Sequence, residues 1–187
     1  MLKQLHDRYS IKLRNFARAE DGVSAIEFIM IAPIVFLVMG VTLETGFMLF
    51  TEFTLQAAVE DAARIVRTGQ AQNGSLTDAA FKTKVCDTIG ALVDCGAVTV
   101  YVRTDSTFAQ MKANLPPLIN IGPATGPTTV SAPPSYAPGG PSQPAIIIAT
   151  YDWSFVSLGM GPAFGNVSGK TARRLIGITL FQNQKYS

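Results

Sequence analysis

The sequence has little charge and few of the residues that build reactive sites. Charged residues make up 15% of the 187 positions, and the chain has one histidine, His6, and two cysteines. A zinc site needs about four ligands, and "GPATGPTT" lacks the lysine of a phosphate-binding loop. Among the acidic residues that follow the apolar run, no pair recurs at metal-ligand spacing. We therefore expect no enzyme, no cofactor and no metal site.

The charge that is present is unevenly distributed. Residues 23–187 contain 10 basic and 10 acidic side chains, whereas the first 22 residues contain five basic and three acidic ones. A neutral body without a basic stripe argues against nucleic acid as a partner. The basic N-terminal segment is better interpreted as a topogenic signal, with Lys3, Arg8, Lys12, Arg14 and Arg18 as its cations.

One long apolar run follows this segment. Residues 28–43 carry no charge, and apart from Glu44 the apolar character continues to Phe50. At about 1.5 Å per residue, such a run spans roughly 35 Å as a helix, enough for a bilayer core of about 30 Å. A buried core helix normally shows a polar stripe, and this run has none wider than Thr42. The sequence predicts a transmembrane helix over residues 23–50.

The flanking charges predict the orientation of this helix. All five basic residues of the N-terminal segment precede it, whereas Glu44 and Glu52 are the nearest charges after the uncharged residues 28–43. Basic flanks stay cytoplasmic, so we expect a single-pass inner-membrane protein with residues 1–22 in the cytoplasm and residues 51–187 in the periplasm. A secretory signal would end in a small-residue cleavage site, and "VTLETGF" offers none.

The helix is predicted to continue beyond the membrane. Val59, Ala62, Ala63 and Val66 are spaced as an amphipathic stripe, and Gly69 is a plausible stop signal. One helix over residues 23–68 would result, with an apolar half and an amphipathic half. Pro33 removes one backbone hydrogen bond inside it, so a kink is expected there.

The sequence of the expected periplasmic part, residues 51–187, predicts an α+β domain. A second helix is expected from residue 75, capped by Ser75 and buried through Phe81, Val85 and Ile89. Three segments have strand character. An antiparallel sheet packed on the amphipathic half of the long helix is the expected arrangement, with strands at residues 97–103, 145–155 and 173–183.

Two features of this domain leave alternatives open. Outside the cytoplasm, Cys86 and Cys95 are expected to form a disulfide, but a continuous helix would hold their Cα atoms about 13 Å apart, beyond the limit of about 7 Å. Either the helix breaks near Gly90 or the bond does not form; we favour the break. The loop over residues 113–144 is rich in proline, and it is either a plain connection or a surface that contacts a partner.

The start of the apolar run resembles a known processing site. "G-VSAI-EF", from Gly22 to Phe28, looks like the site of type IV pilins of the Flp class. "SAIEFIMIAPIVFLVMGVTLETG", "AARIVRTGQAQ", "VCDTIGALVDCGAVTVYVR", "IIIATYDWSF" and "LFQNQKY" together resemble the TadE-like pseudopilins of tight adherence (Tad) pilus systems. The resemblance implies a pilin-like fold. The proline-rich insert and Tyr101 depart from the family pattern.

The resemblance also implies a function. A prepilin peptidase would cleave between Gly22 and Val23, and Glu27 would pair with the freed amine of a neighbouring subunit. The protein would then be a minor pilin used in assembly of Tad pili for surface adherence, located in the inner membrane or in the extracellular pilus. Its partners would be the peptidase, other pilins through the N-terminal helix, the Tad inner-membrane machinery and the lipid bilayer.

A second interpretation remains open from the residues alone. The chain could be an unprocessed single-pass protein whose periplasmic domain binds an envelope partner through the proline-rich loop. The two interpretations differ at the N-terminus, which would be Val23 in the first and Met1 in the second.

Overall fold

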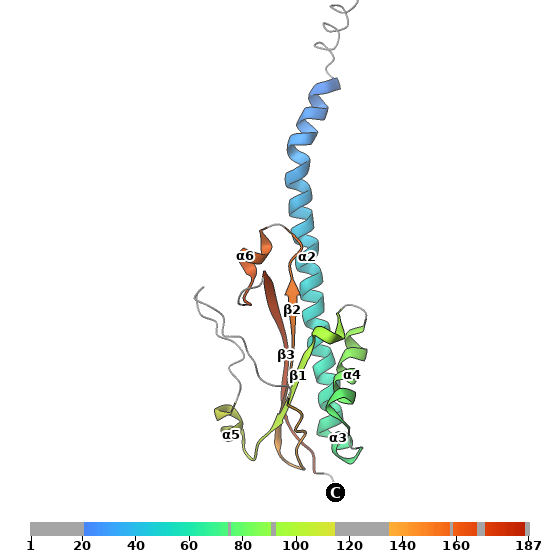
Figure 1. Ribbon diagram of the computed structural model, residues 1–187, viewed down its shortest axis with the longest axis vertical. Helices are drawn as coiled ribbons and strands as arrows, with labels where there is room; N and C mark the ends of the chain where they lie inside the picture. Colours follow the sequence, from blue (N-terminus) through green and yellow to red (C-terminus); the bar gives the residue numbers. More distant parts are fainter. Residues whose placement is uncertain are drawn as a thin grey trace, which may run out of the picture. The chain divides into compact units, whose positions relative to one another are not determined.

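The structure is a computed structural model that describes residues 21–74, 76–90, 93–114, 135–157, 159–167 and 171–185. It consists of two units, one up to Thr42 and one from Leu43 onward. The first unit contains the start of a long helix, and the second contains the rest of that helix and a small α+β domain (Figure 1).

Helix α2 (Asp21–Arg67) contains 47 residues. Its bounds lie within two residues of the predicted range. The stop is at Gly69, which has a φ of 78° and donates its N–H to the carbonyl oxygen of Val66 at 3.1 Å. Glycine reaches this left-handed conformation at no steric cost, so the predicted stop signal is confirmed. Pro33 lies inside the helix, and a kink at that position stays a prediction.

The sheet has three antiparallel strands in the order β1–β2–β3. They are β1 (Thr99–Thr104), β2 (Pro144–Ser154) and β3 (Ala172–Gln182). Each strand begins and ends within two residues of its predicted range. Ile147 of the central strand pairs with Val102 on one side and Thr179 on the other. The predicted α+β class is confirmed.

One face of the sheet packs against the second half of α2. The side chains of the predicted amphipathic stripe, from Val59 to Val66, are all at most 2% exposed. They share one core with alternate residues of the strands, including Val100, Ile147 and Leu175. The opposite face carries a smaller cluster, in which Met111 of helix α5 (Phe108–Ala113) packs with Tyr101, Ile146 and Ile148.

Helix α4 (Asp78–Ile89) follows the single turn of α3 (Gln70–Asn73). Thr77 caps α4, accepting a hydrogen bond from the backbone N–H of Ala80 at 3.3 Å. The cap predicted at Ser75 is therefore wrong by two residues, because the helix begins later than expected. The predicted core side chains of α4 are fully buried; they are Phe81, Val85 and Ile89.

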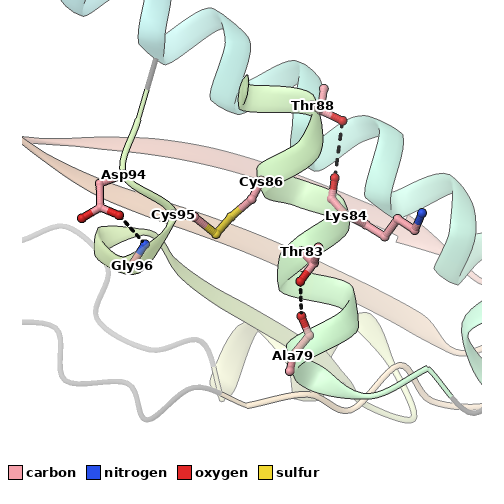
Figure 2. The surroundings of a disulfide bond; sticks show 8 residues. All are labelled: Ala79, Thr83, Lys84, Cys86, Thr88, Asp94, Cys95 and Gly96. Carbon is pink, nitrogen blue, oxygen red and sulfur yellow. Dashed lines mark hydrogen bonds between the residues drawn. A yellow bond between two sulfur atoms is a disulfide. The ribbon is translucent and has the colours of Figure 1, made fainter. Parts of the chain in front are cut away.

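The helix breaks where the cysteine pair requires it. Gly90 has a φ of 66° and ends α4, and the chain returns through the 3-10 turn η2 (Cys95–Ala97). The Cα atoms of Cys86 and Cys95 are 5.7 Å apart and the two residues form a disulfide (Figure 2). The carboxylate of Asp94 accepts the backbone N–H of Gly96 at 2.9 Å and fixes the turn.

Part of the proline-rich loop lies outside the described residues, namely 115–134. Its described end lies against the domain. Tyr136 makes a bridge with Val102 and packs its ring against Phe81, with centroids 5.3 Å apart. The amide of Asn183 donates to the carbonyl oxygens of Pro138 and Gly140. These contacts fix the entry into β2.

Candidate functional site on the N-terminal helix

The predicted processing site lies on the first two turns of α2. The helix begins at Asp21, so Gly22 and Val23 are both helical, and the side chain of Val23 is outside what the structure describes. Glu27 lies four residues after Val23, which places the two on the same side of the helix. The side chain of Glu27 is exposed, and that of Phe28 is 67% exposed.

The helix after this site presents an unbroken apolar surface. Eleven large apolar side chains lie between Ile26 and Met39, and each is 51–72% exposed. Burying one such side chain away from water lowers the free energy by about 1.5–3 kcal/mol. Leaving the whole surface exposed to water therefore costs on the order of 10 kcal/mol. In the described residues, one helix is long and apolar enough to cross a membrane. The arrangement fits a single-pass membrane anchor.

A second carboxylate, Glu44, lies further along α2 and was not predicted to have a role. Its side chain is 8% exposed. Its Oε1 atom accepts the backbone N–H of Val156 at 2.6 Å, and its Oε2 atom accepts that of Ser157 at 2.8 Å. The sequence signal that could have singled it out is its isolation, because it is the one charged residue between Glu27 and Glu52.

The edge of β3 is closed by a side chain of α2. Gln56 donates to the carbonyl oxygen of Ile178 at 3.1 Å and accepts its N–H at 3.0 Å. Its amide also donates to Glu60 at 2.9 Å, which orients it. Both backbone groups at Ile178 are thereby paired, so Gln56 replaces a neighbouring strand at this position.

Two pairs of oppositely charged residues lie at the sheet of the domain. Arg103 donates to Asp105 at 2.9 and 3.1 Å, and this hydrogen-bonded guanidinium holds the pKa of Asp105 below its usual value. Arg174 binds Asp152 in the same two-pronged way. Within the described ranges, no three His, Cys, Asp or Glu residues lie close enough to hold a metal ion. These pairs stabilise strand ends and form no reactive cluster.

The described chain is a long apolar helix that leads into a small α+β domain, and this arrangement fits a pilin-like protein with a single-pass membrane anchor. Residues 22–64 match the family model described as TadE-like protein. Over these residues, about a quarter of the chain, the sequence is similar to that family. No curated protein and no solved structure matches the chain. The match begins at Gly22, the residue that precedes the expected cleavage point, and ends three residues before α2 does.

Proposed function

We propose that this protein is a minor pilin or pseudopilin that a prepilin peptidase processes and that takes part in assembly of Tad pili for surface adherence. The observation that carries the proposal is the family match, which begins at Gly22. The exposed apolar surface of the following helix supports it, because such a surface needs lipid or other helices around it. Before assembly, residues 1–22 would be cytoplasmic and residues 51–187 periplasmic.

Cleavage between Gly22 and Val23 has a physical rationale. A protease must approach the backbone closely, and glycine has no side chain to obstruct it. Cleavage would remove residues 1–22, here called the leader, and with them its five basic residues. Since cationic residues hold the cytoplasmic end of a membrane helix in place, their loss lets the processed helix leave the bilayer during assembly.

Glu27 would then set the register between subunits. The new α-amino group on Val23 is a cation, and a carboxylate in apolar surroundings is tolerable when a cation pairs with it. The carboxylate of Glu27 would bind the amine of a neighbouring subunit as the helices pack together. Other pilins, the peptidase and the Tad inner-membrane machinery are the partners in this scheme.

The substitution Glu27→Gln tests this role. We expect normal cleavage and impaired assembly, because losing one partner of a buried ion pair costs about 3 kcal/mol or more, which corresponds to a more than hundredfold weaker association. Cleavage is measured by the change in apparent mass, and assembly by surface pili and adherence. The matched control is Glu52→Gln, the same change on the same helix beyond the apolar run, which should leave piliation intact. Unchanged piliation in Glu27→Gln would remove the proposed role.

A further inference from the structure

Glu44 fixes one loop of the domain to a defined level of α2. Both oxygens of its carboxylate accept backbone N–H groups, from Val156 at 2.6 Å and from Ser157 at 2.8 Å. These two residues directly follow β2, and helix α6 (Met160–Phe164) comes shortly after them. Figure 1 shows α6 at the end of the sheet where β2 ends and β3 begins. That end of the domain is therefore tied to residue 44.

With the proposed anchor over residues 23–50, residue 44 would lie at the membrane surface or just below it. Glu44 follows directly on the uncharged residues 28–43 and falls within the expected span of 23–50. A carboxylate at that depth is costly unless hydrogen bonds satisfy it. The two amides supplied by the loop provide such bonds and cover the side chain to 8% exposure.

The segment held at this level has an apolar surface of its own. Residues 153–169 carry no charged side chain. The side chain of Val156 is 91% exposed and that of Phe164 is 54% exposed, whereas Met160 and Gly161 are buried and hold α6 to the domain. Exposed apolar side chains next to a membrane segment are typical of interfacial lipid contact.

We propose that residues 155–157 and α6, here called the docking loop, contact the outer leaflet of the bilayer that holds α2. This inference rests on the proposed membrane anchor and goes beyond it, because it assigns the domain a second contact with lipid. The partner is the acyl and headgroup boundary of that leaflet, which would receive Val156 and Phe164. Glu44 sets the depth of the loop, and the loop in turn shields the charge of Glu44 from lipid.

Fluorescence quenching by spin-labelled lipids tests the depth of the docking loop. The chain has one tryptophan, Trp153, so the full-length variant Trp153→Phe provides a background without indole. Three single-tryptophan variants are made in it: Val156→Trp in the loop, Phe36→Trp in the apolar helix and Phe108→Trp in α5. All three native side chains are more than half exposed. The proteins are reconstituted in phosphatidylcholine vesicles with lipids labelled near the headgroup or deep in the chain.

Phe108 is the matched control because it lies at the far end of the sheet. It follows β1 shortly after Thr104, which pairs with Ala145 at the start of β2, whereas Val156 follows the end of β2. The 11 residues of β2 separate these ends by about 35 Å at about 3.3 Å per residue. We expect at least threefold stronger quenching at position 156 than at 108, with the shallow label most effective, and strong quenching at 36 by the deep label.

The outcomes separate this inference from the proposed anchor. One outcome would be strong quenching at position 36 but quenching at position 156 no stronger than at 108. This outcome would overturn the proposed lipid contact of the docking loop and leave the proposed anchor in place. Absence of quenching at position 36 would contradict the anchor itself. Adding Glu44→Ala should reduce quenching at 156 toward the level at 108 and leave position 36 unchanged, and unaltered quenching at 156 would contradict the role given to Glu44. Circular dichroism confirms that each variant is folded.

Discussion

At the scale of the residue, a close approach of α2 to the sheet depends on the absence of a side chain at Gly177. Gly177 lies in β3 and pairs with Ala149 of β2. A Cβ atom at Gly177 would lie 2.9 Å from the carbonyl oxygen of Leu55 and 3.0 Å from Cγ2 of Val59. Real Cβ atoms do not approach backbone oxygen that closely, so α2 can pack at its present distance because this position has no side chain.

The substitution Gly177→Ala is expected to lower the free energy of unfolding by about 1–3 kcal/mol, since the added methyl group overpacks the contact with α2. Denaturant unfolding of the full chain in detergent, followed by the fluorescence of Trp153, measures it. Gly46→Ala is the matched control. No atom lies within 4 Å of its added Cβ, and an alanine in a helix is favoured by up to about 1 kcal/mol. A Gly177→Ala protein as stable as the native chain would contradict the packing described.

The two glutamates of α2 show what residue-level reasoning could and could not find. Glu27 is found from its own neighbours, because the glycine before it and the apolar run after it form one local pattern. The partners of Glu44 lie 112 and 113 residues away along the chain. No local pattern encodes such a pairing, so only the isolation of Glu44 among apolar residues could have indicated it.

At the scale of the element, α4 depends on two kinds of constraint. Phe81, Val85 and Ile89 bury one face of the helix, and the disulfide ties its last turn to η2, with Cys86 and Cys95 nine positions apart (Figure 2). By lowering the entropy of the unfolded chain, a disulfide that closes so short a loop raises the free energy of unfolding by about 2–3 kcal/mol. Without the disulfide, we expect the apolar face still to hold α4 on the core, but the domain to be less stable.

Removal of the disulfide by the double change Cys86→Ser and Cys95→Ser should lower the free energy of unfolding by about 2–3 kcal/mol. The urea midpoint of the full chain measures the change. Reduction of the native protein supplies an internal control, because it should lower the midpoint to about that of the double variant, which should itself be insensitive to reductant. A native midpoint that reduction leaves in place would show that the bond contributes nothing to stability.

The long and regular elements could be predicted from the sequence, and the short ones could not. Strand character located all three strands, with a clear alternation of apolar residues in the first, and Gly69 and Gly90 marked two helix ends that the structure confirms. Helices α5 and α6 have six and five residues, which is too short for a helical period to be recognised. α6 reads "MGPAF", and its glycine and proline favour a turn over a helix.

At the scale of the whole molecule, the chain combines an apolar helix that needs a lipid or protein environment with a domain that has its own core. The helix exposes large apolar side chains along residues 26–39, while the sheet, α4 and the second half of α2 bury theirs. Such a division suits a protein that is held in a membrane first and packed beside other helices later. In our account, the change between these states depends on removal of the leader.

The mass of the mature protein, extracted from membranes and from sheared pili, tests this account most directly. We predict a chain that begins at Val23, lacking the first 22 residues, in cells that make the prepilin peptidase, and a chain that begins at Met1 in cells that lack it. Substitution of Gly22 by a bulky residue such as leucine should have the same effect as loss of the peptidase. An intact leader on protein that supports normal piliation would contradict the account and favour the permanently anchored alternative.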